Sequence, residues 1–239
     1  MRIEQSEFHD QLVRGLTHKM NNILSLFHGY LGLLIEDKKL DRDTLTGLLR
    51  IRDGAEAASR LMDRTKTLAT RSSSSVWRQV TPEDLLRTLL PSLQLYAERG
   101  VELQTTCEPG LPDLWVDSSR LRIALKEIVK NACEASPVRG IVQIAVKLHT
   151  RPVRTKGRRP TTPPISWVAI CVTDAGDGIP AELNAKVFQP FFSTKSKRDS
   201  MGLGLSVALG LIQQLGGALR IQSKPGKTTV KVLLPSRAV

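Results

Sequence analysis

Three short segments near the C-terminal end of the chain constrain its fold more than any other feature. They are Asp174–Pro180 (DAGDGIP), Phe188–Lys195 (FQPFFSTK) and Gly202–Ser206 (GLGLS). The first follows an apolar run, Trp167–Val172, that predicts a buried strand. The last opens another apolar run, Leu203–Leu215, that predicts a helix. The sequence therefore predicts a strand, an acidic glycine turn, a loop, and a helix that begins with glycines.

These segments have the residue types of a nucleotide site. Gly176 and Gly178 allow a tight turn against a flat ligand, and Asp174 would be a fixed acceptor for an exocyclic amine such as that of adenine. Gly202 and Gly204 lie at a predicted helix N-terminus, where free N–H groups and the helix dipole favour a phosphate. Each segment alone also fits an ordinary strand–loop–helix connection without a ligand, because glycine turns are common.

In this order, the three segments resemble the G1, F and G2 boxes of the histidine-kinase ATP-binding domain, in the wider superfamily of gyrase, Hsp90 and MutL. Upstream, Arg120–Pro137 (RLRIALKEIVKNACEASP) is similar to the N box of that family, with Glu127 and Asn131 on one helical face. The resemblance covers nearly the whole chain. It implies an α+β protein in which a two-helix hairpin precedes an α/β sandwich ATP-binding domain.

The resemblance also implies roles for single residues, with ATP and Mg²⁺ as the cofactors. Asn131 would bind Mg²⁺, which prefers oxygen ligands and bridges phosphates. Glu127 would reach the metal through water or act as a base, although a Glu on a helix surface is the alternative. Lys130 would contact a phosphate or be an ordinary solvated lysine. The implied nucleotide-binding residues are Lys130, Asn131, Asp174, Gly176, Gly178, Ile179, Lys195, Gly202, Leu203, Gly204, Leu205 and Thr228.

A lid over the phosphates is implied from Phe188 through Ser200. Lys195 is its expected phosphate contact, and Phe191 and Phe192 are expected to pack within the lid rather than on the ligand. Ser200 replaces the first glycine of the fullest G2 form, whereas Gly202 and Gly204 are present.

Two long amphipathic helices are predicted before this domain. The first covers about residues 3–36 and the second ends near residue 70, with a polar break at Lys38–Asp41 and Asp41 or Asp43 as the N-cap of the second. The apolar side of the first is Phe8, Leu12, Leu16, Ile23, Phe27, Leu31 and Leu34. A hairpin of two such helices cannot bury its own stripe, so we expect a homodimer that forms a four-helix bundle.

A serine-rich linker, Arg71–Ser75, separates the hairpin from the rest of the chain. We expect a hairpin domain at residues 1–72, a linker at 73–79 and the ATP-binding domain at 80–239. Thr81 and Pro82 open a helix predicted to reach about Arg99, and Asp117 or Ser118 caps the helix of the N box. Strands are predicted at 76–80, 101–107, 114–116, 141–148, 165–173, 218–223 and 228–234, in one mixed sheet with helices on one face.

Within the first helix, His18 is the candidate phosphate acceptor. At about 100° per residue it lies about 200° from Leu16, away from the apolar stripe, where an imidazole is ordinarily a solvated surface group. The segment Thr17–Ile23 (THKMNNI) resembles the H box of histidine kinases, usually His-Glu/Asp-x-x-Asn/Thr-Pro. The resemblance implies that a neutral His18 nitrogen attacks the γ-phosphoryl group of ATP.

Two positions depart from the H box. Lys19 stands where the family has an acid that orients the imidazole or accepts its proton; a charged Lys cannot accept a proton, although it could steady a phosphoryl group. Ile23 replaces the proline, so the usual kink is not expected. Asn22 matches the position that, in related kinases, orients the water that hydrolyses a phosphorylated partner. His18, Lys19, Asn22 and Glu127 are thus the candidate catalytic residues.

Composition narrows the class of protein. The net charge of +12 would suit a polyanion or an acidic protein partner. The densest basic cluster, in Arg151–Arg159, is Pro- and Thr-rich, which favours a solvated loop over a nucleic-acid site. No apolar run is long enough for a membrane span, and the N-terminus has no signal-peptide core, so we expect a cytoplasmic protein without membrane insertion. Cys107, Cys133 and Cys171 lack metal-ligand spacing and are expected to be reduced.

The sequence thus favours a homodimeric histidine kinase that passes a phosphoryl group from His18 to an aspartate of a response-regulator receiver domain. A kinase-impaired regulator phosphatase or an ATP-binding signalling scaffold is the alternative, because of Lys19. A serine kinase or anti-sigma module is disfavoured, since those relatives lack the helical hairpin. We expect no sensor domain before Phe8, so the input signal would come from a separate sensor protein, from a removed segment or from the helices themselves.

Overall fold

The structure is a computed structural model that describes residues 2–36, 40–69, 76–97, 100–151, 153, 166–194 and 202–236, with side chains described from residue 15 onwards except 60, 61 and 64–69. The chain divides into two compact units, Met1–Ser73 (unit 1) and Ser74–Val239 (unit 2).

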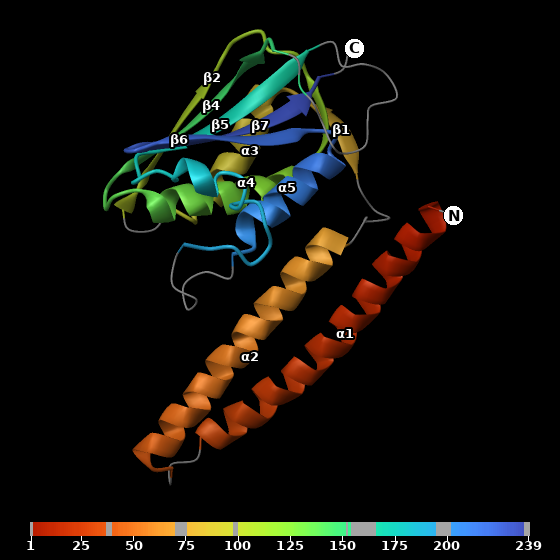
Figure 1. The fold of residues 1–239 in the computed structure, drawn as a ribbon, viewed down its shortest axis with the longest axis vertical. Helices are drawn as coiled ribbons and strands as arrows, with labels where there is room; N and C mark the ends of the chain where they lie inside the picture. Colours follow the sequence, from red (N-terminus) through yellow and green to blue (C-terminus); the bar gives the residue numbers. More distant parts are fainter. Residues whose placement is uncertain are drawn as a thin grey trace. The chain divides into compact units, whose positions relative to one another are not determined.

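Unit 1 is a hairpin of two long helices, α1 (Arg2–Ile35) and α2 (Arg42–Ala69), which run antiparallel (Figure 1). Of the two expected caps, Asp41 is the one used, because its Oδ1 accepts the backbone N–H groups of Asp43 at 3.0 Å and Thr44 at 2.9 Å. The Thr44 hydroxyl also donates to Asp41 Oδ2, and these hydrogen bonds, that of the hydroxyl foremost, lower the pKa of the Asp41 carboxyl.

The side of α1 that packs against α2 differs from the predicted apolar stripe. Of the described α1 side chains, Thr17, Leu24 and Leu31 are the buried ones, and they recur every seven residues. Leu31 belongs to the predicted stripe, whereas most of the stripe's other described members are about half exposed, and Phe8 and Leu12 lie outside the described side chains. A single partner helix covers only a narrow strip, which explains the difference. Large apolar side chains remain exposed on α1 at alternating spacings of four and three residues. We call this set the exposed stripe; its members are Leu16, Met20, Ile23, Phe27, Tyr30 and Leu34.

Unit 2 is built on a five-stranded mixed sheet in the order β2-β4-β5-β7-β6. Its strands are β2 (Glu102–Cys107), β4 (Ile141–His149), β5 (Trp167–Asp174), β6 (Ala218–Lys224) and β7 (Lys227–Pro235). The β2–β4 pair is parallel and the other pairs are antiparallel. The helices of this unit lie on one side of the sheet (Figure 1); they are α3 (Pro82–Gln94), α4 (Ser118–Ala135) and α5 (Gly204–Gln214). The predicted α+β sandwich is therefore present, with its helices on one face.

Two details of this prediction are wrong. The strand β1 (Trp77–Val80) pairs with β3 (Leu114–Asp117) in a separate two-stranded sheet rather than joining the main one. Both strands lead directly into capped helices, α3 and α4, and β3 meets the end of the main sheet only through a single antiparallel bridge between Leu114 and Ser236, the residue after β7. The helix α3 ends at Gln94 instead of near Arg99, a residue outside the described ones, because the chain tightens after Leu93 into turns with bonds between residues three apart.

The core of unit 2 lies between the sheet and its helices. Val168, Ile170 and Val172 point from β5 toward the helices and are fully buried. On the other, helix-free side, Ala169, Cys171 and Leu233 form a smaller apolar cluster. The central strand β5 is thus buried on both faces, which explains why it reads as a continuous apolar run rather than an alternating one.

Membrane crossing needs a long apolar helix, and none of the helices in the described part of the chain meets that requirement.

Candidate functional site

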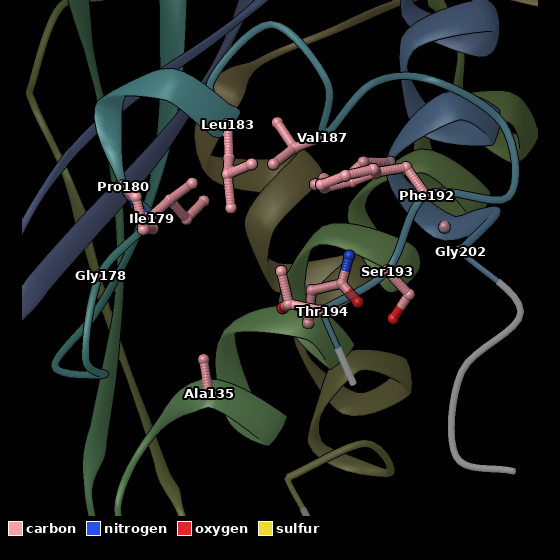
Figure 2. Close-up of a pocket in the computed structure, with 13 residues that line it drawn as sticks. Ala135, Gly178, Ile179, Pro180, Leu183, Val187, Phe192, Ser193, Thr194 and Gly202 are labelled. Atoms are coloured by element: carbon pink, nitrogen blue, oxygen red, sulfur yellow. The ribbon is translucent and has the colours of Figure 1, made fainter. Parts of the chain in front are cut away.

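A cavity of about 200 Å³ lies in unit 2 between the C-terminal end of α4, the turn after β5 and the start of α5 (Figure 2). Apolar side chains such as Ile179, Leu183, Val187 and Phe192 form one part of its wall (Figure 2). The complete lining is Asn131, Ala135, Gly178, Ile179, Pro180, Leu183, Val187, Phe192, Ser193, Thr194, Gly202, Gly204 and Leu205. Its residues come from all four sequence boxes, which are far apart in the chain.

Asp174 lies at the end of β5, next to the cavity wall, and is 5% exposed. Its Oδ1 accepts the backbone N–H of Gly176 at 3.0 Å, so the carboxylate holds the acidic turn in place. Across the sheet, Asp174 pairs with Thr228 of β7, which is also buried. Asp174, Gly176 and Thr228 are not among the lining residues, but they border them: a Cβ on Gly176 would lie 2.5 Å from the carbonyl oxygen of Ala135, which lines the cavity.

The turn itself is docked onto the β6–β7 hairpin. Ser223 Oγ accepts the backbone N–H of Ile179 at 2.7 Å and lies 2.8 Å from Thr228 Oγ1, with which it shares a hydrogen bond. Gly178 has φ of +89°, and a Cβ there would lie 2.5 Å from the carbonyl oxygen of Lys224. Only glycine fits so close to the hairpin in this conformation. Ser223 was missed by the sequence analysis, because it belongs to no motif and reaches the site only through strand pairing with Thr228.

The N-box side chains meet the start of α5. Glu127 is 7% exposed, and a Cβ on Gly204 would lie 3.0 Å from its Oε2 and 3.3 Å from Asn131 Nδ2. The two predicted side chains are thus brought to the first residue of the helix that carries the G2 glycines. Lys130 is placed differently, because its Nζ lies 3.7 Å from Glu134 Oε1 and its side chain does not line the cavity.

The N-terminus of α5 has the geometry of an anion seat. Its N-cap residue Leu203 is buried, and no described side chain caps the helix there. Gly202 just before it has φ of +64°, and a Cβ at this position would lie 2.5 Å from the carbonyl oxygen of Phe192. Helix N–H groups without a side-chain cap attract an anion such as a phosphate. Leu203 can contribute only through its backbone, whereas Leu205 lines the cavity.

The segment predicted to form a lid is described as far as Thr194, so Lys195 and Ser200 lie outside the described residues. Phe192 faces the cavity (Figure 2), together with Ser193 and Thr194. Phe191 does not pack in a lid as expected: it is 68% exposed and has φ of +66°. The backbone of Phe191, and not its ring, makes the close approach to the G2 segment: its carbonyl carbon would lie 2.6 Å from a Cβ on Gly202.

The oxygen atoms at this site suit a hard cation such as Mg²⁺. Asn131 Oδ1 and Glu127 Oε2 lie beside the start of α5, within 3.7 Å and 3.0 Å of the position of a Gly204 Cβ. In the described part of the chain, no three His, Cys, Asp or Glu side chains form a cluster that could hold a metal alone. Mg²⁺ keeps several waters and commonly binds through substrate phosphates, so these residues fit a metal that arrives with a nucleotide.

The remaining predicted residues lie on α1 of unit 1. His18, Lys19 and Asn22 are exposed, and His18 and Asn22 share one face because they are one helical turn apart. The neighbouring Asn21 points toward the hairpin interior, where its Nδ2 donates to Asp63 Oδ1 of α2 at 3.3 Å. The contacts of α1 with α2, such as the bond from Asn21 to Asp63, fix which side of α1 faces α2. His18 lies on a side that α2 does not cover, so its imidazole is exposed to solvent.

Residues 116–238 match the model of the histidine kinase-, DNA gyrase B-, and HSP90-like ATPase family. The chain is 30% identical to the sensor kinase CckA of Brucella abortus (strain 2308). The match covers 94% of this chain and 24% of CckA. The chain is 29% identical to the sensory histidine kinase/phosphatase NtrB of Vibrio alginolyticus, again over 94% of its length and 61% of NtrB. The chain therefore spans between about a quarter and three fifths of these curated relatives.

Among solved structures, full-length ShkA in complex with AMPPNP superposes with a TM-score of 0.65 at 22% identity, over 96% of this chain and 47% of ShkA. This likeness concerns the fold.

Proposed function

This chain belongs to the histidine kinase-, DNA gyrase B- and HSP90-like ATPase family and carries the ATPase core of a two-component sensor histidine kinase, and on that premise we propose that it phosphorylates its own His18 with ATP. The observation that carries the proposal is the convergence of all four boxes on one cavity, next to a helix N-terminus without a side-chain cap.

In the proposed complex the adenine ring enters the cavity beside Ile179, and the Asp174 carboxylate accepts a hydrogen bond from its exocyclic amine. Asp174 suits this role because it is buried and held by the N–H of Gly176 at 3.0 Å. Gly202, Leu203 and Gly204 offer backbone N–H groups to the phosphates, and Asn131 and Glu127 offer oxygens to the metal. When bound, Mg²⁺ neutralises phosphate charge. Lys195 is the proposed lid contact, whereas the pairing of Lys130 with Glu134 leaves it a weaker candidate.

The phosphoryl transfer needs an imidazole that the ATP-bound domain can reach, and His18 is exposed. One ring nitrogen forms a bond to the γ-phosphorus as the bond from phosphorus to the β–γ bridging oxygen breaks and ADP leaves. The other ring nitrogen gives up its proton to water, because Lys19 cannot accept it while charged. In this proposal Lys19, the next residue, would instead attract the transferred phosphoryl group, which carries negative charge.

A hydrolytic activity on the regulator is supported by Asn22. Its amide lies one helical turn from His18 on the same exposed face, where it could orient a water toward the phosphorylated aspartate of a receiver domain docked on α1. The relatives named histidine kinase/phosphatase combine both activities in their names. We therefore propose a bifunctional enzyme whose partner is a response-regulator receiver domain.

A homodimer is part of the same proposal. The exposed stripe on α1 repeats at spacings of four and three, the pattern with which helices pack in bundles. A second copy of the hairpin would cover this stripe and complete a four-helix bundle.

The test is incubation of the full chain with γ-labelled ATP and Mg²⁺, beside the variants His18→Gln, Lys19→Glu and His28→Gln. We expect acid-labile, base-stable label on the wild type, none on His18→Gln and unchanged label on His28→Gln. His28 is the matched control because it lies on the same helix, with its Nδ1 held 2.7 Å from the carbonyl oxygen of Leu24.

A different result would support the alternative function. If the wild type binds ATP but takes up no label, and Lys19→Glu gains it, the chain is a regulator phosphatase or an ATP-binding scaffold whose kinase step is disabled by Lys19. Label that survives in His18→Gln would contradict the proposed acceptor.

A further inference from the structure

The helix-free face of the main sheet carries more positive than negative charge. Among the described strands, the register places one carboxylate on this face, that of Glu102 at the start of the edge strand β2. Within strands β4, β5, β6 and β7 the one acidic residue is Asp174, and it belongs to the opposite, helix-covered face. Five cations of these strands point to the helix-free side, and we call the surface that they form the outer basic face. They are Lys147, Arg220, Lys224, Lys227 and Lys231. In sequence, the connection from β4 to β5 adds further Lys and Arg residues and no acid.

The β6–β7 hairpin places like charges directly opposite each other. Arg220 pairs with Lys231, and Lys224 pairs with Lys227, with the neutral residues Gln222 and Thr229 between them. Like charges directly opposite across an antiparallel pair destabilise a sheet. Two such pairs on one hairpin therefore oppose folding instead of supporting it.

Protection of a sheet edge does not account for these charges. Lysine on an edge strand prevents unwanted pairing with other chains, and β6 is an edge strand. However, Lys227 and Lys231 lie on β7 and Lys147 lies on β4, which are both interior strands. The charges on interior strands need another explanation.

The cations also act together on one partly buried imidazole. His149 at the end of β4 has its pKa lowered by burial first, and then by the charges of Arg220, Lys231, Arg151 and Lys147. Its Nε2 is buried and has no hydrogen-bond partner among the described residues. Residues from three strands thus create one positive field over the small apolar cluster of Ala169, Cys171 and Leu233.

From this arrangement we propose that the outer basic face is a docking surface for an acidic segment of a partner protein. The two like-charge pairs are four residues apart along the hairpin, or about 13 Å in a strand. Carboxylate clusters separated by a neutral stretch match this spacing, and each cluster would meet one pair. Nucleic acid has a continuous row of phosphates, so several of them would lie over the neutral band of Gln222 and Thr229 without a cation. This surface is independent of His18 and of the nucleotide cavity.

The experiment measures binding of the full chain, without nucleotide, to a labelled extended peptide that carries two Glu-Glu pairs about 13 Å apart in an uncharged sequence. We expect salt-dependent binding that falls about tenfold in the double variant Arg220→Gln/Lys231→Gln. The unfolding midpoint of the same variant should stay equal or rise, because a repulsive pair is removed. A merely structural role would lower both.

The matched control is Arg50→Gln/Arg122→Gln, which removes two exposed arginines from helices and leaves the same net charge. We expect its peptide affinity to stay within about twofold of the wild type. Equal losses in both double variants would mean that net charge alone attracts the peptide, and would overturn the proposal. So would the absence of peptide binding at low salt. Tighter binding of a DNA duplex that is lost in Arg220→Gln/Lys231→Gln would make the face a nucleic-acid surface instead.

Discussion

Unit 2 buries its large apolar side chains within one chain, whereas helix α1 of unit 1 leaves most of its own in water. Ile170, Leu125 and Leu233 are at most 1% exposed, and the sheet and helices of unit 2 close over them. On α1, Phe27 is 52% and Tyr30 is 68% exposed, and the buried positions include a threonine, Thr17. The difference teaches that unit 2 buries its core within one copy of the chain, while α2 alone leaves a large apolar surface of α1 uncovered.

Unit 2 nevertheless has an unfinished surface of another kind. Its outer basic face exposes like-charge pairs on β6 and β7, and these two strands carry no carboxylate that would balance their repulsion. Exposed apolar area attracts a second apolar surface, whereas unbalanced charge attracts an opposite charge. The exposed stripe is thus the surface for which we propose a second copy of the hairpin, and the outer basic face is the surface for which we propose an acidic partner.

The largest effect is expected from breaking the exposed stripe. In the variant Phe27→Ser/Tyr30→Ser, a dimer loses four aromatic side chains from its interface, and we expect it to weaken about 1,000-fold, or about 4 kcal/mol. Sedimentation equilibrium of the full chain measures this dissociation constant.

The control Leu26→Ser/Leu33→Ser removes two side chains that are 62% and 69% exposed on a neighbouring face of the same helix. It should weaken the dimer much less. A monomeric wild type, or equal weakening in both double variants, would contradict the idea that the exposed stripe is an interface.

A smaller effect is expected within unit 2, at Ser223. Its hydroxyl holds the N–H of Ile179 at 2.7 Å and so positions one wall of the cavity. The variant Ser223→Ala should raise the dissociation constant for ATP about 5- to 10-fold, the equivalent of about one hydrogen bond. Titration calorimetry of the full chain with ATP and Mg²⁺ measures it.

Ser223→Thr keeps the hydroxyl and should restore the affinity, which separates positioning of the turn from general loss of stability. Ser166→Ala is the matched control, because the Ser166 hydroxyl pairs with that of Ser236 at 2.6 Å and neither residue lines the cavity. If Ser223→Ala binds ATP as the wild type does, the hydrogen bond to Ile179 has no part in nucleotide binding.

Features that depend on neighbours in sequence were predictable. The caps at Asp41, Thr81 and Asp117 each bind backbone N–H groups of the following helix. The sequence indicated Thr81 directly, and for the other two helices it narrowed the cap to a pair of residues that includes the one used. The strand before Asp174 and the helix after Gly202 also begin and end within about two residues of the predicted positions. Local motifs suffice for these elements because the interacting groups are close in the chain.

Features that depend on pairing across the chain were not predictable. Ser223 reaches the site through the β6–β7 register, and β1 joins β3 in its own sheet, and neither is encoded in a local motif. The exposed side of α1 depends on how α2 packs against it. The position of Lys130, by contrast, could have been anticipated, since Glu134 follows it four residues later on the same helix.

The smallest effect is expected from pH on the outer basic face. Burial and four nearby cations hold the pKa of folded His149 below its usual value of 6.5. The unfolded chain therefore binds a proton near pH 6.5 that the folded chain takes up only at lower pH. Because the unfolded state then binds more protons, the free energy of unfolding of unit 2 should fall as pH decreases below 6.5.

His149→Gln should remove this part of the pH dependence, while leaving the free energy of unfolding nearly unchanged at pH 7.5, where His149 is neutral in both states. His149 is the one histidine in the sequence of unit 2, and the tryptophans Trp77, Trp115 and Trp167 all lie there, so denaturant unfolding followed by tryptophan fluorescence isolates it. Carboxylates also titrate toward pH 5, so the comparison is between variant and wild type at each pH. Parallel curves from pH 7.5 to 5.5 would mean that the pKa of His149 is not lowered in the folded chain. A wild-type curve that falls below that of the variant as the pH decreases would confirm the lowered pKa, to which burial contributes first and the nearby cations next.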